Sequence, residues 1–398
     1  MTDPKPGANP RERLGRYEVL GKIADGGMAV VYVARRDDGE IVALKRIRED
    51  LAKNRDFLTM LRDEAKIVSY LRHPNIVRYD ELGGGETTAF LAMELLYGQS
   101  LWSVWEACRE RGVRLRYEMI AWIGARVADG LHYAHELVDD HGARLDIVHR
   151  DVNATNVFVT YDGEVKVIDF GLAKAANRAS KTAAGIIKGK VAYMSPEQAM
   201  GAAVDRRTDV FALGTTLWEL ACDRRLFKSE DDVDTLARIH DADVPDPTRL
   251  VDGFPPALAH ILRRALARRP EERYRTAAEM ARALDDFAGS GVTAATVAEV
   301  MRELFAEDRA RQLAWIAEVS APGSARPVEP LKSRSTFWAR REAPPSAASR
   351  RAPSGLAPGA VSPSRVGDDA STVRRLVPIV LAIAIVVAVV VVVALAFR

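Results

Sequence analysis

The spacing of the apolar residues changes near residue 100, and this change constrains the fold more strongly than any other feature. Before it, short apolar runs such as RYEVLGKI, AVVYVARR and EIVALKRI are separated by Gly or Asp-Gly turns, which is typical of antiparallel hairpins. A helical pattern covers 57–71, and strand-like runs cover 76–80 and 89–95. Beyond residue 100, apolar residues recur at i, i+3 and i+4, which indicates helices. The sequence therefore predicts an α+β fold of two lobes, a small antiparallel sheet with one helix and a larger, mainly helical lobe.

The composition indicates a globular chain without a strong overall charge. With 398 residues, 48% of them hydrophobic and 28% charged, the chain can build a substantial core. Its 57 Lys and Arg nearly balance 55 Asp and Glu, so we expect no nucleic acid as a partner. Cys108 and Cys222 lack a CxxC spacing, and we expect them to be buried apolar residues in a reducing compartment.

The composition along the chain predicts several segments. Residues 1–16 are polar, without the apolar stretch of a signal peptide, and are expected to form a disordered tail ahead of a folded domain at 17–288. An amphipathic helical extension at 292–320 is expected to pack on the second lobe or on a partner. The segment 321–375 is rich in Pro, Ser, Ala and Arg, which is typical of a disordered linker. Its ten Lys or Arg and four Asp or Glu suit a position near anionic lipid, with a merely solvated linker as the alternative.

Residues 376–397 form an apolar run of 22 residues without a charge, and about 20 suffice to cross a bilayer. A buried core element is the alternative. Arg374 and Arg375 precede the run and only Arg398 follows it, so the positive-inside rule predicts a single-pass helix in the cytoplasmic membrane. The folded domain would lie in the cytoplasm and the C-terminus across the membrane. A homodimer through this helix stays open, because the run lacks GxxxG.

A glycine-rich loop, ADGGMAVVY at 24–32, lies between two strand-like runs. This position argues against a dinucleotide-binding turn, which opens a helix, and the GxxxxGK[ST] of a P-loop is absent from the loop. A backbone without side chains can close over phosphates, and an ordinary flexible turn is the alternative.

The motifs that follow this loop decide between these alternatives. VALK places Lys45 at the end of the next strand, where a cation can hold phosphates, and Glu64 follows on a helix, placed to pair with it. HRDVNATN offers Asp151 as a base and Asn156 as a metal ligand. IDFG supplies Asp169 as a second metal ligand, and MSPEQ follows about 25 residues later. One such motif arises easily by chance, whereas the ordered set does not.

This ordered set resembles the eukaryotic-like protein kinases, and GGMA and YMSPEQ are most similar to their bacterial Ser/Thr branch, the Hanks-type kinases. The resemblance covers residues 17–288 and implies the two-lobed protein kinase fold. It implies an enzyme that transfers the γ-phosphate of ATP to Ser or Thr of protein substrates, with Mg²⁺ as the metal and Mn²⁺ as an alternative. Membrane-proximal signalling and autophosphorylation on the activation loop would follow. A catalytically silent pseudokinase that acts as a nucleotide-binding scaffold is the alternative.

The resemblance also implies roles for single residues. Lys45 would orient ATP, Glu64 would fix Lys45, Asp151 would accept or orient the substrate proton, and Asn156 and Asp169 would hold Mg²⁺. Met93 would be the gatekeeper of a hinge at 94–96, and His149 and Phe170 would join an internal apolar column. Glu197 would pair with Arg273, and Asp209 would tie the catalytic loop from below. The nucleotide would contact Ile23, Ala24, Gly26, Gly27, Val31, Ala43, Lys45, Met93, Glu94, Leu96 and Phe158.

The chain departs from the family pattern at several positions. Ala24 and Ala29 replace two glycines of GxGxxG, so we expect a stiffer hairpin. Asn153 replaces a lysine that in the family donates to the γ-phosphate and to the catalytic aspartate, and Ala154 replaces the usual proline. Lys190 stands where the family has a threonine that faces the same aspartate. We therefore expect Lys190 to supply the missing ammonium; a solvated Lys190 and slower turnover is the alternative.

Arg150, next to Asp151, suggests control by phosphorylation. In the family, such an arginine binds a phosphate on the activation loop. The available hydroxyls in NRASKTAAG are Ser180 and Thr182, and we slightly favour Thr182.

Overall fold

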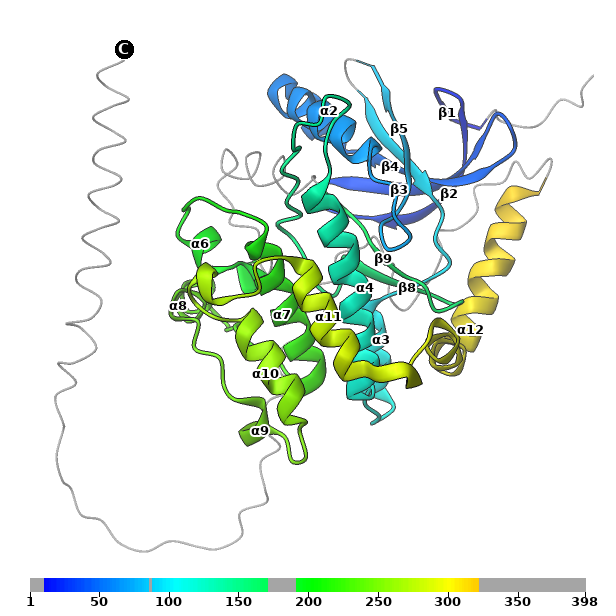
Figure 1. The fold of residues 1–398 in the computed structure, drawn as a ribbon. Coiled ribbons are helices and arrows are strands. Elements are labelled where there is room, and N and C mark those ends of the chain that lie inside the picture. Colours follow the sequence, from blue (N-terminus) through cyan, green and yellow to red (C-terminus); the bar gives the residue numbers. More distant parts are fainter. Residues whose placement is uncertain (1–10, 86–87, 171–190, 322–398) are drawn as a thin grey trace, which may run out of the picture. The chain divides into compact units, whose positions relative to one another are not determined.

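The computed structural model describes residues 11–85, 88–170 and 191–321. In this part of the chain, the first lobe is a sheet in which every neighbouring pair of strands is antiparallel (Figure 1). Its strands are β1 (Arg13–Leu14), β2 (Tyr17–Asp25), β3 (Ala29–Arg36), β4 (Ile41–Ile47), β5 (Tyr79–Gly84) and β6 (Ala89–Glu94). They lie in the order β1-β2-β3-β4-β6-β5, so that consecutive strands are mostly neighbours.

Two helices follow β4 and pack on this sheet. The first, α1 (Glu49–Ala52), is a single turn, and the second, α2 (Arg55–Ser69), occupies the segment predicted to be helical. Phe57, Leu58 and Leu61 of α2 are buried together with Ala29 and Ile47 of the sheet. Residues three and four apart lie on one face of a helix, so this apolar face packs on the strands.

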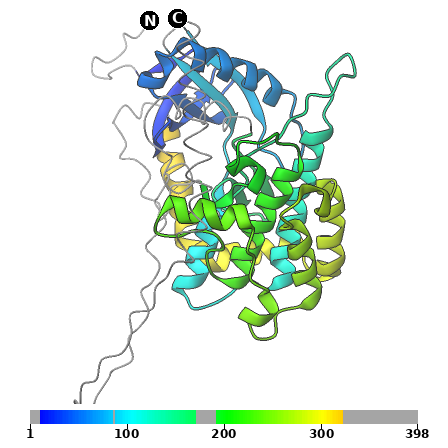
Figure 2. The same ribbon diagram turned by 90° about the vertical axis from the view of Figure 1, so that its left-hand side faces the viewer.

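The second lobe is mainly helical, as the spacing of apolar residues predicts. Its helices are α3 (Leu101–Glu110), α4 (Tyr117–Glu136), α6 (Pro196–Ala199), α7 (Arg207–Cys222), α8 (Asp232–Asp241), α9 (Pro247–Leu250), α10 (Pro256–Ala265), α11 (Ala277–Ala288) and α12 (Ala294–Ser320). Short 3₁₀ turns are η1 (Val191–Tyr193), η2 (Pro270–Glu272) and η3 (Gly289–Gly291). Figures 1 and 2 show α7, α10 and α11 below the sheet of the first lobe, and part of α12 beside this sheet.

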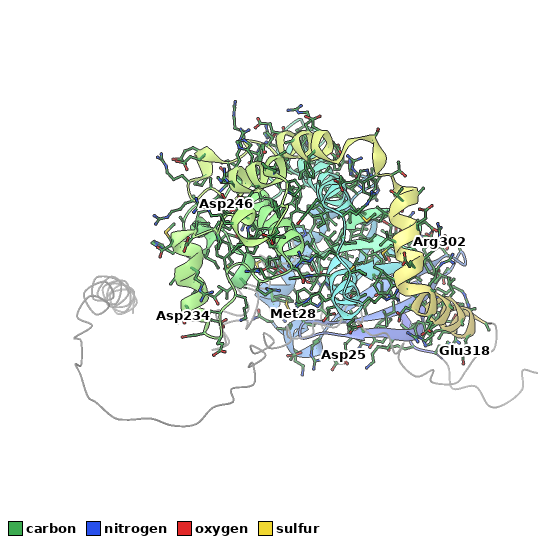
Figure 3. All side chains as sticks on the ribbon, turned by 90° about the horizontal axis from the view of Figure 1, so that it is seen from below. Asp25, Met28, Asp234, Asp246, Arg302 and Glu318 are labelled. Carbon is green, nitrogen blue, oxygen red and sulfur yellow. The ribbon has the colours of Figure 1, made fainter. Side chains whose placement is uncertain are left out.

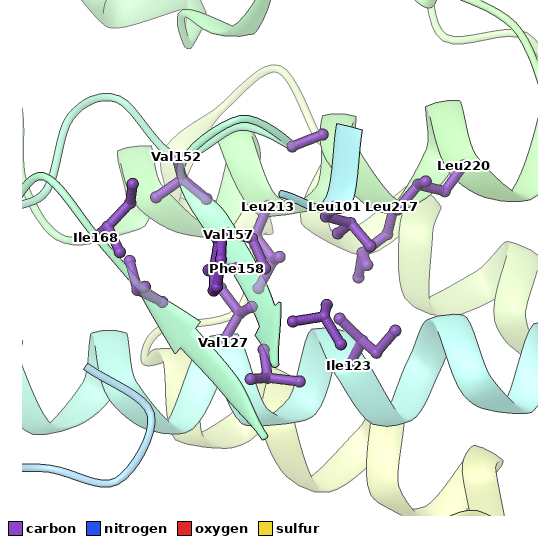
Figure 4. Close-up of a cluster of buried hydrophobic side chains, with 14 of the residues drawn as sticks. Leu101, Ile123, Val127, Val152, Val157, Phe158, Ile168, Leu213, Leu217 and Leu220 are labelled. Carbon is purple, nitrogen blue, oxygen red and sulfur yellow. The ribbon is translucent and has the colours of Figure 1, made fainter. Parts of the chain in front are cut away.

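Helix α7 is the centre of this lobe, because every residue from 208 to 222 is buried. Its two interior threonines remain compatible with burial because their hydroxyls bond back to the helix. The hydroxyl of Thr215 donates to the carbonyl of Phe211, and that of Thr216 to the carbonyl of Ala212. Figure 4 shows Leu213 of the same helix beside apolar side chains of α4 and of the HRDVNATN region.

A second, three-stranded sheet joins the lobes. It consists of β7 (Gly98–Ser100), β8 (Val157–Thr160) and β9 (Val165–Val167), in that spatial order. The backbone N–H of Val77 donates to the carbonyl of Val167 at 3.0 Å, and the N–H of Val167 donates to the carbonyl of Asn75 at 2.8 Å. Residues 75–77 are therefore occupied by β9, which is why β5 begins later than the predicted run at 76–80. The two-lobed α+β fold itself is confirmed.

Helix α12 extends beyond this frame. It breaks at Phe305, where φ and ψ are −133° and 28°. It contacts the end of α3 and the turn after β8 before the break, and β2 after it. The extension thus packs on both lobes and not on the second lobe alone. Within the ranges described above, no helix is both long and apolar enough to span a membrane. The predicted span at 376–397 lies outside these ranges.

A buried ion pair holds the MSPEQ segment on the helical lobe. Arg273 donates to both carboxylate oxygens of Glu197, at 2.7 and 2.8 Å, and also to the backbone carbonyls of Ala267, Arg268 and Arg207. Burial opposes the charge of Glu197, but the hydrogen bonds and charge of Arg273 prevail and lower the pKa of this carboxyl. The pair is therefore ionised, and its polar atoms are well satisfied.

We predict that Arg273→Ala destabilises the protein by about 3–5 kcal/mol, because it leaves the buried Glu197 carboxylate without its cation. Denaturant unfolding of the full chain in detergent measures this loss. Arg269→Ala is the matched control, since the Arg269 side chain is 66% exposed beside Glu271 and its removal should change stability far less than Arg273→Ala does. Equal effects of the two changes would contradict the role given to the buried pair.

Candidate active site

The HRDVNATN loop is held from below by the carboxylate of Asp209, in the first turn of α7. This carboxylate, 0% exposed, accepts the backbone N–H groups of His149 and Arg150 at 2.8 Å each, and Nε2 of His135 at 2.8 Å. Burial opposes its charge, but His135 and the backbone donors lower the pKa of the Asp209 carboxyl. Arg150 has φ 66°, a left-handed conformation that a non-glycine residue adopts at a cost. The bonds to Asp209 keep the backbone in that conformation.

His149 ties the loop to the IDFG segment. Its Nδ1 accepts the backbone N–H of Asp151 at 3.2 Å, so the ring proton lies on Nε2, which donates to the carbonyl of Ile168 at 2.8 Å. The ring also packs edge-on against Phe170, with centroids 4.6 Å apart. The positions of Asp151 and of residues 168–170 therefore depend on each other.

Two amides hold the carboxylate of Asp151. Nδ2 of Asn153 donates to Oδ1 of Asp151 at 3.2 Å, and Nδ2 of Asn156 donates to Oδ2 at 3.1 Å. Each amide also donates to the backbone carbonyl of Asp151, at 2.9 and 2.8 Å. These bonds fix the direction in which the carboxylate points.

The orientation of the Asn153 amide follows from its neighbour Thr155. Oδ1 of Asn153 accepts the backbone N–H of Thr155 at 2.9 Å, and an N–H can only donate. The NH₂ group of Asn153 must therefore face Asp151. Asn153 thus supplies a neutral donor to the aspartate at the position where the family pattern has a lysine.

Lys45 and Asp169 form an ion pair, with Nζ and Oδ1 2.6 Å apart. Asp169 has φ 64°, and its backbone N–H donates to the hydroxyl oxygen of Tyr79 at 3.0 Å. Burial, and then the negative charge of Asp169, raise the pKa of Tyr79, so this phenol stays neutral. The side chain of Glu64, the predicted partner of Lys45, lies outside what the structure describes, although its backbone belongs to α2.

The residues fit a divalent cation that takes some of its ligands from the protein and others from phosphates. The backbone N–H of Ile168 donates to the carbonyl of Asn156 at 3.0 Å, which keeps Asn156 next to the segment that carries Asp169. In the described ranges no three His, Cys, Asp or Glu side chains gather in a cluster that could hold a metal. Mg²⁺ suits such a site, because it commonly uses one or two protein ligands, several waters and phosphate oxygens.

The predicted nucleotide residues of the first lobe lie on neighbouring strands. Ala24 pairs with Val31 and Val31 with Lys45, and one row further Ala43 pairs with Met93. Residues opposite each other in an antiparallel sheet share a face. The apolar members lie in one buried cluster with residues of the second lobe: Ile23, Ala24, Val31, Ala43, Met93, Leu96 and Phe158.

The hairpin tip and the hinge complete this set. The N–H of Gly26 donates to the carbonyl of Ala29 at 3.0 Å, which closes the turn that contains Gly27. Glu94 accepts the N–H of Arg78 at 2.8 Å and pairs with Lys166 of β9 at 3.0 Å, so the connection between the lobes is held from both sides.

The site also contains supporting residues whose roles the sequence did not predict. Tyr79 supports Asp169, His135 supports Asp209, and Thr155 orients Asn153. The polar residue types alone gave no signal for them, since each acts through a partner distant in the fold or through local amide geometry. Lys190, Ser180 and Thr182 lie outside the described ranges. Arg150 is described, and its carbonyl accepts Nε2 of Gln198 from α6 at 3.1 Å.

The family model described as "Protein kinase domain" matches residues 17–284. The tyrosine-protein kinase MasK of Myxococcus xanthus is 38% identical over 302 residues, which cover 74% of this chain and 47% of MasK. The serine/threonine-protein kinase PknL of Mycobacterium tuberculosis is 36% identical over 276 residues, 69% of this chain and 66% of PknL. The serine/threonine-protein kinase PrkC of Bacillus subtilis is 34% identical over 268 residues, which cover 67% of this chain and 39% of PrkC. The chain thus spans less than two thirds of the length of each.

Among solved structures, the kinase domain of PknI from Mycobacterium tuberculosis matches with a TM-score of 0.55 at 22% identity. The match covers 71% of this chain and 100% of that domain, and it supports the fold. On the match of the family model over residues 17–284, together with the lysine, aspartates and asparagine that the two lobes bring together, the chain belongs to the protein kinase domain family.

Proposed function

We propose that the chain is a serine/threonine protein kinase that transfers the γ-phosphate of ATP to hydroxyl groups of proteins. The observation that carries this proposal is the Asp151 carboxylate, oriented by two amides beside the segment that holds Asp169 and its partner Lys45. The names of PknL and PrkC support Ser and Thr as acceptors, whereas the name of MasK makes tyrosine the acceptor to be tested against them.

The residues divide the work of phosphoryl transfer between them. A bound divalent cation would neutralise charge on the phosphates, and Asn156 and Asp169 would hold it. Lys45 would bind phosphate oxygens. Asp151 would accept the hydroxyl proton of the substrate as the new oxygen–phosphorus bond forms, and the leaving group is ADP. Positioning is most of this catalysis, which is why the double amide support of Asp151 carries weight.

The missing lysine of the catalytic loop leaves a charge to be supplied. Asn153 donates a hydrogen bond to Asp151 but brings no positive charge toward a phosphate. Lys190 precedes η1 directly and is our candidate for this cation. The side chain of Arg150 would bind a phosphate on Thr182 or Ser180. Its backbone is held in place for this role by hydrogen bonds at both the N–H and the carbonyl.

The apolar run at 376–397 supports a proposal on location. Its length and flanking arginines favour a single-pass anchor that leaves the kinase domain at the cytoplasmic face of the membrane. Protein substrates near the bilayer would then be the accessible ones.

We predict that the full chain in detergent, given labelled ATP and Mg²⁺, phosphorylates itself or a generic protein on Ser or Thr. Asp151→Asn should lower the rate by about 10²- to 10⁴-fold, because it removes the base, and should leave nucleotide binding intact. Phosphoamino-acid analysis and mass spectrometry identify the product, with Thr182 or Ser180 as expected sites. A wild-type rate equal to that of Asp151→Asn would favour the pseudokinase, and phosphotyrosine alone would overturn the Ser/Thr assignment.

We predict that Lys190→Ala lowers the transfer rate by about 10²-fold, the scale of a lost charge-stabilising donor. The double change Asn153→Lys with Lys190→Ala should recover most of the rate, because it returns an ammonium to the catalytic loop. Lys190→Arg, which keeps the charge, is the matched control. A Lys190→Ala enzyme as fast as the wild type would show that the neutral amide of Asn153 suffices.

We predict that the chain, produced in bacterial cells, stays with the membrane fraction through a high-salt wash and is released by detergent. Deletion of residues 376–398 should release it without detergent, since the apolar run provides the binding energy. If the deleted chain still sediments with membranes, the basic linker and not the apolar run is the attachment.

A further inference from the structure

Helix α12 lies beyond the residues that the family model matches and connects the two lobes (Figure 1). Its first half is fixed to the helical lobe. A Cβ atom on Gly163 would lie 1.9 Å from the carbonyl oxygen of Ala294, so the β8–β9 turn touches the backbone of α12. Arg111, at the end of α3, donates to the carbonyls of Glu303 and Leu304, at 2.9 and 2.6 Å. These carbonyls lie directly before the break at Phe305, where helical partners are lost.

The second half of α12 is fixed to the sheet of the first lobe. Ile316 and Val319 are buried in the same apolar cluster that contains Ile23 and Ala43 of the candidate nucleotide site. Arg11 donates to the carbonyl of Val319 at 3.1 Å, and Arg35 donates to the carbonyl of Ser320. Two arginines of the first lobe thus satisfy carbonyls at the negative end of the helix.

Helix α12 closely approaches the first lobe at Gly21 of β2. A Cβ atom built there would lie 2.9 Å from Cζ2 of Trp315 and 3.2 Å from Cγ1 of Val319, so the absence of a side chain lets α12 reach the strand. Gly21 pairs with Val33, which pairs with Ala43, and Ala43 pairs with Met93. Because paired residues share a face, α12 meets the face of the sheet that carries the nucleotide residues.

The strand is irregular at the same place. The pairing of β2 with β3 shifts between Val19 and Gly21 and again between Lys22 and Ala24. Such irregularities interrupt the ladder and bend the strand. Support from outside the sheet therefore matters most at Gly21, four residues before the hairpin at 25–29 begins. In Figure 3, Asp25 and Met28 mark the hairpin, and Glu318 marks the half of α12 that lies along the sheet.

We propose that Trp315 and Val319 are positioning residues for nucleotide binding. By packing on Gly21 they hold β2, and with it the hairpin at 25–29, in the place from which its backbone closes over the phosphates of ATP. The proposal rests on the proposed function only for the identity of the nucleotide. Its test is direct binding, which does not require phosphate transfer.

The first experiment measures the affinity of the full chain in detergent for ADP and for a non-hydrolysable ATP analogue with Mg²⁺. Trp315→Ala should weaken binding by about tenfold, and, where the chain transfers phosphate, should raise KM for ATP more than it lowers kcat. Leu313→Ala is the matched control, because Leu313 is on the same half of α12 with 42% of its surface exposed. The nucleotide affinity of this variant should stay within about twofold of that of the wild type. A Trp315→Ala protein with a lower melting temperature but unchanged affinity would overturn the proposal.

The second experiment asks whether Gly21 and Trp315 act through their contact. Gly21→Ala adds a methyl group that Trp315 leaves no room for, so the single change should weaken nucleotide binding by about three- to tenfold. In the Trp315→Ala background the methyl group has space, and the same change should alter affinity by less than about twofold. Such non-additivity identifies a direct interaction. Equal effects in both backgrounds would assign the role of Gly21 to the strand alone and overturn the proposed contact.

An absence of phosphate transfer in the wild type would contradict the proposed function, but nucleotide affinity could still be measured and would still test the role of Trp315. Hydrogen exchange of the β2 amides gives an independent measurement, since Trp315→Ala should reduce their protection while that of α7 is kept. Unchanged protection of β2 would contradict the role of α12 as a support.

Discussion

The site depends first on one buried carboxylate, that of Asp209. It sits in the first turn of α7, where a negative charge is favoured by the helix dipole, and three donors converge on it. Two of these donors are consecutive backbone N–H groups, so the carboxylate fixes a stretch of main chain and not merely a side chain. The left-handed conformation of Arg150 follows from this constraint, and the direction in which the chain enters Asp151 follows from that conformation.

Few contacts connect this loop to the first lobe. The ring of His149 links the loop to the carbonyl of Ile168, and residues 75–77 pair with β9 just before that segment. Lys45 then reaches Asp169 from the sheet. The first two of these steps use backbone groups or a buried ring, which have little freedom to move, whereas the last is an ion pair between two side chains. A change in how the lobes meet therefore alters the position of Asp169 more readily than that of Asp151, which is held within its own loop.

The sequence was informative where the signal is periodic or ordered, and uninformative where it depends on distant partners. Alternation of apolar residues predicted the hairpins and the helical lobe, because one face of each element must be buried. The small sheet β7-β8-β9 was not predicted, since strands of three or four residues are too short for a pattern of apolar residues to be recognised. Asn153 was recognised as a departure from the family pattern. Its role as a donor to Asp151 could be inferred only from the position of Thr155, which orients the amide. The break at Phe305 likewise follows from contacts with α3 and β2 and not from a local glycine or proline.

Packing explains why alanines are present at two positions of the glycine-rich hairpin. Ala24 is buried in the cluster that the lobes share, whereas Ala29 is buried with the apolar face of α2. The methyl groups thus anchor opposite sides of the hairpin to different parts of the molecule, which glycines could not do. On our proposal α12 also holds β2 at Gly21, so contacts hold both strands of the hairpin, while Gly27 at its tip is exposed.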